Sequence, residues 1–379
     1  MSRCIGLIGV IITVGLAQCS ASVSDRIATP ENLVIPQPSA RVFTMWGSQV
    51  SHPLMQNQWH STPQNNQGAH ALLSEGAVAT SPLKPLRLRD CWVQGGPRTR
   101  WGFRCYGPKD WILSNTKIFD IKDEHGCYFN SCWNITWQGV RFENIGSQGI
   151  QIVWRDSEAQ NPDVCLDPYG DGRGSVQRVT RCLFLEVGQP TGGRPSYAVS
   201  FFERQPCTTR LPIDVVIEKS WFEASKHTNH EAAGGPWHSY GAIMIHGRRR
   251  IVIDSNVVRY SKPNRAIIQV WDCNELILAN CEVAEGLVDI RNVEKVTIHD
   301  NKGDALVQIA DGPLYSTPND SKLTIIHKGV ISGSFSKQPR GRPPANGSNT
   351  NLKASIAPIA GEEDIENKSV TVIVEVEEK

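Results

Sequence analysis

The sequence predicts an all-β solenoid, and two observations carry that prediction. The first is an internal repeat: the pattern of residues 134–142, Asn-Ile-Thr-Trp-Gln-Gly-Val-Arg-Phe, returns at spacings of about 20 to 42 residues, and repeats of this length are typical of solenoids. The second is the alternation of inward and outward residues in each unit, as in 251–253, which indicates strands. Seven equivalent positions anchor the repeat: Thr116, Val140, Cys182, Ser220, Asn256, Cys281 and Asn301.

Each unit contains more than one strand. A second alternating run follows most anchors and begins at Gly149, Val199, Ile243, Ile268, Val288 and Val307. The anchor column is small and mixed in polarity, so it predicts only a partial ladder of hydrogen bonds between turns. Two positions after the anchor, Phe142, Phe184 and Phe222 are expected to stack in the core before giving way to Val258 and Val283.

This pattern resembles the single-stranded right-handed parallel β-helix of pectate-lyase-like proteins, in which each coil has three strands and the coils lie about 4.8 Å apart. The resemblance covers residues 111–311 and rests on the repeat, without a catalytic motif of any subfamily. It implies an exported bacterial protein. The predicted divisions are a signal peptide at 1–21, an irregular N-terminal cap at 22–110, the β-helix at 111–335, and a linker with a C-terminal tail at 336–379.

The N-terminus indicates export. Arg3 precedes an apolar run at 5–17, which is shorter than the roughly 20 residues of a membrane-spanning helix and is typical of a secretory signal. Residues 16–19 resemble a lipobox with Gln18 at a position where a small residue is usual, so a lipid anchor at Cys19 and ordinary cleavage near Ala21 both remain open. We expect a secreted, periplasmic or cell-surface protein without an integral span in the mature chain.

Composition excludes some partners and cofactors. The formal net charge is only +1, which argues against a nucleic-acid partner. An odd number of cysteines follows Cys19, and Cys165 with Cys207 is the candidate disulfide. No Cys-x-x-Cys occurs, and we expect no metal or cofactor, with a calcium loop at 167–174 as the weaker alternative.

One face of the predicted coil carries the candidate site. Insertions at 155–174, 188–196, 205–212 and 225–240 flank the second strand of successive coils and are expected to rise as walls beside it. Because strands alternate faces, the residues between the inward ones are expected to point into solvent. They form two columns: Gln151, Ser200, Met244, Gln269, Asp289 and Gln308, and Val153, Phe202, His246, Trp271, Arg291 and Ala310.

These outward residues suit a polysaccharide. Trp271 is expected to stack on a sugar ring, Gln151, Gln269 and Asp289 to bind hydroxyl groups, and Arg291 to bind a carboxylate. The insertions add Arg155, Trp237 and Tyr240 as candidate substrate-binding residues. The same columns are also compatible with an ordinary solvated sheet face.

Catalysis is a narrower prediction. Within the resemblance, polysaccharide lyases use a basic residue to remove a proton beside a uronate carboxylate, so His246 or His238 would be the base and Arg291 the neutralising group. The paired carboxylates of β-helix hydrolases are absent, which disfavours hydrolysis. The sequence therefore favours a protein that acts on or binds an extended, acidic polysaccharide, with β-elimination as the reaction if it is catalytic. The alternative is a non-catalytic surface, adhesion or carbohydrate-binding solenoid. Oligomeric state is left open.

Overall fold

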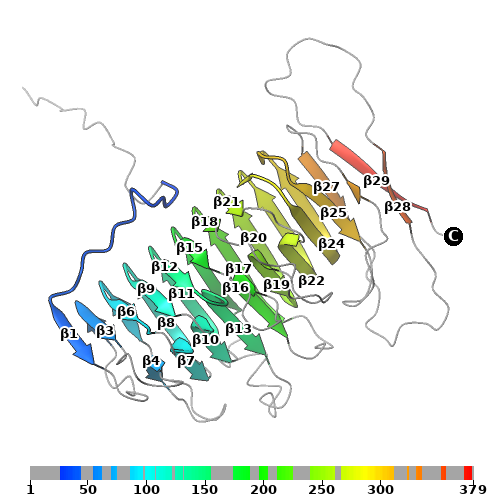
Figure 1. Cartoon of the computed structure of the whole chain (residues 1–379). Helices are drawn as coiled ribbons and strands as arrows, with labels where there is room; N and C mark the ends of the chain where they lie inside the picture. Colours follow the sequence, from blue (N-terminus) through cyan, green and yellow to red (C-terminus); the bar gives the residue numbers. More distant parts are fainter. Residues whose placement is uncertain are drawn as a thin grey trace, which may run out of the picture.

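The fold is a right-handed parallel β-helix whose coils stack along one axis (Figure 1). The computed structural model describes residues 26–43, 54–61, 70–74, 86–96, 99–106, 108–121, 124–130, 132–154, 174–187, 196–203, 211–224, 240–260, 266–310, 322–323, 330–334, 351–355 and 371–377. Within these ranges every regular element is a strand. The predicted fold class is confirmed.

Most of the described coils contribute one strand to each of three parallel sheets, numbered 1 to 3 below. Sheet 1 has nine short strands among the described residues: β1 (Ala40–Phe43), β3 (Gln58–Ser61), β6 (Trp92–Gln94), β9 (Lys117–Ile121), β12 (Arg141–Ile145), β15 (Leu183–Val187), β18 (Trp221–Ala224), β21 (Val257–Tyr260) and β23 (Glu282–Val283). Sheet 2 follows sheet 1 in each coil. It contains β4 (His70–Ser74), β7 (Trp101–Tyr106), β10 (His125–Asn130), β13 (Ile150–Trp154), β16 (Ser196–Glu203) and β19 (Tyr240–His246), the first parts of β22 (Ala266–Ala279) and β24 (Leu287–His299), and β25 (Leu306–Ala310).

Sheet 3 closes the coil. Its strands are β2 (Leu54–Gln56), β5 (Arg87–Arg89), β8 (Lys109–Ser114), β11 (Trp133–Gln138), β14 (Ser175–Thr180), β17 (Leu211–Glu218), β20 (Arg248–Asp254) and the second parts of β22 and β24. After β24 the pattern changes, because β27 (Val330–Ser334) pairs with it antiparallel and β26 (Lys322–Leu323) pairs antiparallel with β25. The chain ends in β28 (Asn351–Ser355) and β29 (Thr371–Glu377), an antiparallel pair.

A two-residue turn joins sheet 3 to sheet 1 in each coil. Its first residue has a positive φ, the left-handed region in which Asn, Asp and Gly are favoured. The described residues at this place are Asn57, Asp90, Asn115, Gly139, Arg181, Lys219, Ser255, Asn280 and Asp300. Its second residue is the anchor, whose side chain is buried or nearly so in the core. The turn therefore holds every coil in the same register.

The anchor column forms the expected partial ladder. Ser220 Oγ accepts from Cys182 N at 3.0 Å, and Asn256 Oδ1 accepts from Ser220 N at 3.0 Å. Asn256 Nδ2 donates to Ile217 O at 2.9 Å. Asn301 makes the same pair of bonds one coil on from Cys281, whereas Val140 makes none through its side chain because it is apolar. The ladder is thus continuous only where the anchors are Ser or Asn.

Stacked aromatic rings fill the core beside sheet 1. Phe142 and Phe184 lie 4.8 Å apart between ring centroids with planes 3° from parallel, and Phe184 and Phe222 lie 4.7 Å apart at 2°. Sheet 1 pairs Phe222 with Val258 and Val258 with Val283, as the sequence predicts. In the corner leading into sheet 2, Gly126 leaves no room for a side chain, since a Cβ there would lie 2.6 Å from Gly149 O.

Cysteines in the described coil are buried thiols without disulfides: Cys91, Cys105, Cys127, Cys132, Cys182, Cys273 and Cys281. Burial raises the pKa of Cys182 and Cys281 to about 12, so both are protonated and chemically inert at neutral pH. They act as small apolar core residues. Cys165 and Cys207, the predicted disulfide, lie outside the described residues.

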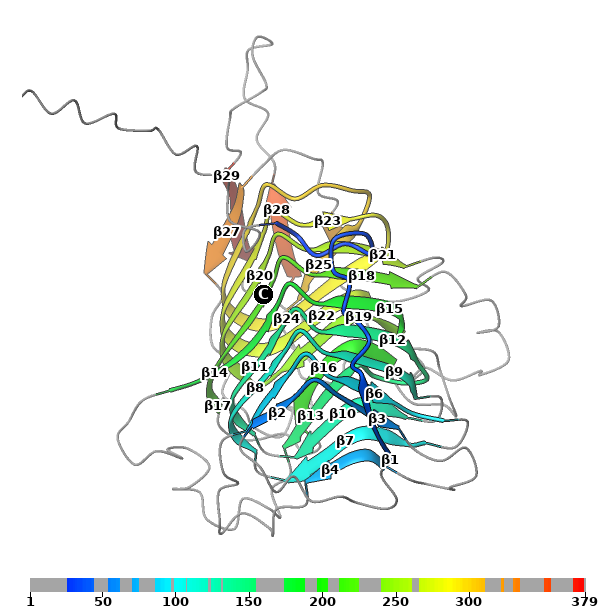
Figure 2. The ribbon, with the colours of Figure 1, turned by 90° about the vertical axis from the view of Figure 1, so that its left-hand side faces the viewer.

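An N-terminal strap, residues 26–39, crosses the outer side of sheet 1 along the helix axis and leads into β1 (Figure 2). Near its start, Ala28 N donates to Lys219 O at 2.9 Å, at the turn before β18. Ala28, Leu33 and Ile35 are buried and pack with Leu183. The strap therefore contacts coils that are far apart in sequence.

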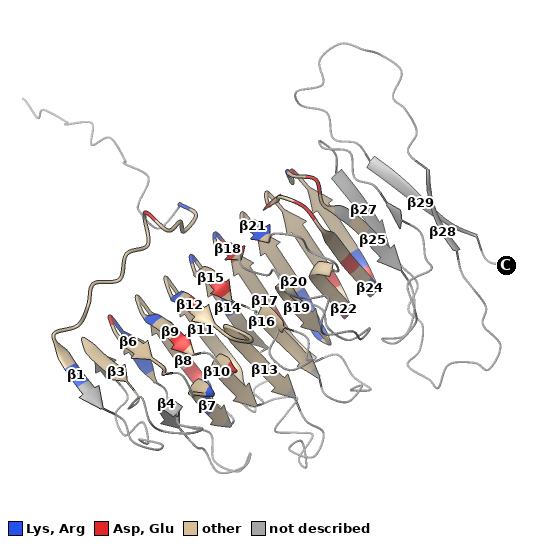
Figure 3. Ribbon diagram, in the orientation of Figure 1, with Lys and Arg blue, Asp and Glu red and all other residues tan. Residues whose placement is uncertain are grey.

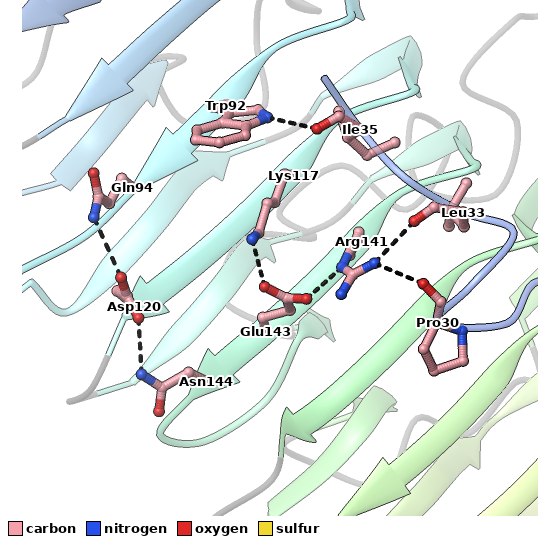
Figure 4. Close-up of polar contacts among 10 residues, drawn as sticks. All are labelled: Pro30, Leu33, Ile35, Trp92, Gln94, Lys117, Asp120, Arg141, Glu143 and Asn144. Atoms are coloured by element: carbon pink, nitrogen blue, oxygen red, sulfur yellow. Dashed lines mark hydrogen bonds and ion pairs between the residues drawn. The ribbon is translucent and has the colours of Figure 1, made fainter. Parts of the chain in front are cut away.

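Polar contacts hold the strap on the sheet (Figure 4). Arg141 Nη1 donates to the carbonyl oxygens of Pro30 at 3.2 Å and Leu33 at 3.0 Å. Arg141 Nε also pairs with Glu143, which pairs with Lys117 at 2.6 Å. These bonds satisfy carbonyl groups that have no sheet partner, which is the requirement for an irregular segment lying against a protein surface.

The coil begins earlier than the sequence pattern predicts. Residues 22–110 were expected to form an irregular cap, but β1, β3 and β6 are rungs of sheet 1 in register with β9. These strands are three or four residues long, too short for alternation to be recognised in the sequence. Within the predicted linker and C-terminal tail, residues 351–355 and 371–377 form β28 and β29. The signal peptide, Cys19 and most of the four insertions lie outside the described residues.

The ladder is tested by Asn256→Ala, which leaves Ser220 N and Ile217 O unpaired in the core. We expect a loss of about 1–3 kcal/mol in the free energy of unfolding, measured by denaturant titration. Thr297→Ala on the outward side of β24 is the control and should change it by less than about 0.5 kcal/mol. Equal effects of the two substitutions would contradict a role for the ladder.

The strap is tested by Arg141→Ala. We expect faster amide hydrogen exchange at Ala28 and Leu33, because the strap loses two hydrogen bonds to its carbonyl groups. Arg178→Ala, which removes a half-exposed ion pair with Glu218 on sheet 3, is the control. Unchanged exchange in the strap would show that apolar packing alone holds it.

Candidate functional site

The register of sheet 2 confirms the two predicted outward columns. One column pairs Tyr128 with Gln151, and continues through Ser200, Met244, Gln269, Asp289 and Gln308. In the other, His246 pairs with Trp271, Trp271 with Arg291, and Arg291 with Ala310. The three predicted residues of the second column therefore lie on consecutive coils, as inferred from spacing.

The outward side chains do not face open solvent, and that prediction is wrong. His246 and Gln269 are each 8% exposed, Arg291 5% and Asp289 3%, whereas Trp271 is half-buried. Part of the reason is the column itself: side chains on adjacent rungs stand about 4.8 Å apart and pack on one another. These polar groups thus act in a partly dehydrated environment, where electrostatic interactions are stronger than in water.

His246, Trp271 and Arg291 form a continuous stack. The rings of His246 and Trp271 have centroids 4.5 Å apart and planes 7° from parallel. On the next coil, Arg291 Cζ lies 5.2 Å from the Trp271 ring centroid. Because the two neighbours are on opposite sides, both faces of the indole are occupied. Only the edge of the Trp271 ring is left uncovered by these two neighbours, so this geometry does not offer the predicted stacking of a sugar on its face.

Asp289 connects the two columns. Its carboxylate accepts from Arg291 Nε at 2.9 and 3.0 Å and from Trp271 Nε1 at 3.2 Å. Asp289 and Arg291 are two residues apart on β24, so their side chains lie on the same side of one strand. The pair is buried, and the negative charge of Asp289 balances the positive charge of Arg291. Their mutual hydrogen bonds hold both side chains in place.

His246 is held as a neutral ring. Burial lowers its pKa from 6.5 to about 3, the positive charge of Arg248 acts in the same direction, and the hydrogen bond with Gln269 opposes both. His246 Nε2 lies 3.4 Å from Gln269 Oε1. A base with so low a pKa accepts a proton poorly at neutral pH, so this environment does not favour His246 as a general base.

The structure brings five of the predicted site residues together and separates the others. His246, Gln269, Trp271, Asp289 and Arg291 form one connected cluster, which we call the β22–β24 cluster. Gln151 lies in the same column three coils away. Tyr240 begins β19, where it pairs with Ser196, and its side chain is not described. Arg155, Trp237 and His238 lie outside the described residues.

A second set of aromatic residues on sheet 2 was missed from the sequence. Trp101 and Tyr128 pack with Val153 and Phe202, and Tyr128 stacks on His125 with ring centroids 5.4 Å apart. Arg104 lies over Trp101 at 5.0 Å. Continuing the outward column back from Gln151 through Tyr128 to Arg104 would have found part of this set.

Within the described ranges, no three His, Cys, Asp or Glu side chains cluster so as to hold a metal ion. The residues 167–174, the alternative calcium loop, lie almost entirely outside them. No described helix has the length and apolar character to cross a membrane.

The fold and this outer face define a right-handed parallel β-helix protein with a polar and aromatic cluster on sheet 2. No family model matches the chain, and no curated protein matches it. A surface adhesin of Streptococcus pneumoniae, PfbA, is similar in structure, with 12% identity and a TM-score of 0.37 over 73% of this chain and 66% of that one. The catalytic domain of a GH87 α-1,3-glucanase in complex with nigerose has 11% identity and a TM-score of 0.30, over 73% and 63%. The chain thus spans less than two thirds of these neighbours, and likenesses this low do not bear on its function.

Acidification tests the environment of His246. The neutral ring of His246 is favoured in the folded state. Its contribution to stability is complete above pH 6.5 and is lost as the pH falls from 6.5 toward 3, because in this range the unfolded chain binds a proton that the folded chain does not bind. We expect His246→Phe, which keeps a ring against Trp271, to lose less thermal stability between pH 7 and pH 4 than the wild type. His299→Phe, at the partly exposed end of β24, is the control. Parallel pH curves for all three proteins would contradict a buried neutral His246.

Proposed function

We propose that the chain binds an extended polysaccharide along the outer face of sheet 2, with the β22–β24 cluster as its central contact. The observation that carries this proposal is the convergence of His246, Gln269, Trp271, Asp289 and Arg291 on one patch of a sheet face directed away from the core. Amide and carboxylate groups beside the edge of an aromatic ring can hydrogen-bond the hydroxyl groups of a sugar and contact its ring. The coils repeat along the helix axis, and a polysaccharide repeats along its chain. Successive sugar units can therefore contact successive coils.

The charge of the cluster favours a neutral glycan. An acidic glycan was expected because Arg291 would bind a carboxylate, but Arg291 is already paired with Asp289 and His246 is neutral. Acidic and basic residues are also interspersed over the described strands (Figure 3). A uronate chain would therefore meet no net positive charge in the cluster, whereas uncharged hydroxyl groups need only donors and acceptors.

The same facts favour binding without cleavage. Elimination from a uronate requires a base and a cation free to stabilise the developing negative charge. In the cluster, the pKa of His246 is about 3 and Arg291 is engaged by Asp289. His238, the other predicted base, lies outside the described residues. We therefore propose a carbohydrate-binding solenoid, with the lyase scheme as an outcome that the experiment below would reveal.

A spacer without a ligand is the second candidate, and the burial of the cluster favours it. Side chains that are 3–8% exposed and satisfy one another can also serve to stabilise consecutive coils. This alternative predicts that substitutions in the cluster change the free energy of unfolding without changing affinity for any glycan. The two functions are thus separable by measurement.

Calorimetric titration with neutral polymers (xylan, mannan, β-glucan) and acidic ones (polygalacturonate, alginate) tests the proposal. We expect binding to a neutral polymer, weakened about tenfold or more by Trp271→Ala, which corresponds to about 1.4 kcal/mol. Trp221→Ala on sheet 1 is the control and should bind like the wild type. Thermal unfolding of each variant checks that the fold is kept.

Three results would contradict the proposal. Equal affinities of wild type and Trp271→Ala, or no binding to any polymer, would favour the spacer. Ultraviolet absorbance of unsaturated products from polygalacturonate or alginate, abolished by His246→Ala, would establish a lyase instead.

A further inference from the structure

A group of buried polar atoms on the outer face of sheet 2 has no partner within the described chain. Asn130 is fully buried, and both its Oδ1 and Nδ2 lack a hydrogen bond. Gln151 Oε1 and Ser200 Oγ, in side chains that are 7% and 0% exposed, also lack one. Buried polar groups are nearly always paired, and an unpaired one is destabilising.

These atoms lie close together on consecutive coils. Gln151 on β13 pairs with Ser200 on β16, and on the other side with Tyr128 on β10. Asn130 is two residues after Tyr128 and on the same face, which places its Cα about 8 Å from that of Gln151. One contiguous surface therefore carries two unpaired acceptor oxygens, an unpaired amide donor, and a hydroxyl that can donate or accept.

Buried amides in the core make at least some hydrogen bonds within the chain. Asn256 makes two hydrogen bonds in the anchor column. Gln177, buried inside the coil, donates through Nε2 to Cys132 O at 3.2 Å, and its Oε1 has no partner. What distinguishes the three side chains on the outward side of sheet 2 is that their unpaired atoms fall on neighbouring positions of consecutive coils. An external partner is the natural source of the missing hydrogen bonds.

We propose that Asn130, Gln151 and Ser200 form a second subsite, which binds hydroxyl groups of an uncharged sugar unit of the same glycan. This inference rests on the proposed function and extends it to the length of the ligand. A hydroxyl group both donates and accepts, so neighbouring hydroxyls satisfy an amide nitrogen and an amide oxygen together. None of the three side chains carries a charge, and the subsite therefore offers nothing to a carboxylate or a phosphate.

The spacing of the two subsites sets a minimum ligand length. Gln151 and Gln269 lie in one column with Ser200 and Met244 between them, three inter-strand steps or roughly 14 Å apart. A single sugar ring is too short to contact both places. A chain of several units lying along the helix axis reaches from Asn130 to Trp271, passing over the apolar Met244.

A length series separates the subsites. We would titrate wild type, Asn130→Leu and Gln151→Leu with xylo-, manno- and cello-oligosaccharides from disaccharide to hexasaccharide. We expect the affinity of the wild type to rise with length, and the two variants to bind the hexasaccharide at least tenfold more weakly while binding the disaccharide equally well. Gln138→Leu, at an exposed position on β11, is the matched control and should bind like the wild type.

Thermal unfolding gives a second readout that does not depend on a ligand. Replacing an unpaired buried amide with an apolar side chain of similar shape removes a desolvation penalty, so the melting temperature of Asn130→Leu should rise. A lowered melting temperature would show that Asn130 is satisfied within the chain and would overturn the subsite.

The outcomes distinguish this inference from the proposed function. If Trp271→Ala weakens binding at every length and Asn130→Leu and Gln151→Leu at none, the function stands and the second subsite is wrong. If the wild type binds none of the oligosaccharides or polymers, both are wrong.

Discussion

The two-residue turn between sheets 3 and 1 is the constraint on which the rest of the structure depends. At each coil it requires one residue with positive φ, which an Asn or Asp adopts at low cost, followed by an anchor that enters the core. A parallel strand shifted by one residue would exchange its inward and outward side chains. Because the turn has the same geometry in each coil, the coils share one register. This shared register aligns the stacked rings of the core and the outward columns of sheet 2.

The sequence was sufficient for the fold and for the membership of the outward columns. Alternation around a recurring anchor placed His246, Trp271 and Arg291 on consecutive coils, which the strand pairing confirms. Alternation says which side of a sheet a residue occupies but nothing about what packs on it. It therefore predicted exposure for Asp289 and Arg291, which bind each other and are buried. Whether these residues bind a glycan remains a prediction.

Other features left no periodic signal. The strands β1, β3 and β6 each have too few residues for a pattern, so the beginning of the coil was placed too late. The strap is irregular in sequence because its register is set by Arg141 and by packing on sheet 1, not by its own alternation. Unpaired atoms such as those of Asn130 can be found only from three-dimensional contacts, since Asn is equally common in turns, caps and ladders.

The strap also has a consequence for the order of folding. It leaves the ribosome before the coils that it contacts, because Arg141 and Lys219, to which it bonds, are synthesised more than a hundred residues later. Coils can wind on one another as they emerge, because each contacts mainly its neighbours. The strap must instead wait until the coil containing Lys219 is in place. Its docking therefore marks the completion of the coils up to the turn before β18, and it joins those coils into one cooperative unit rather than a series of independently fraying turns.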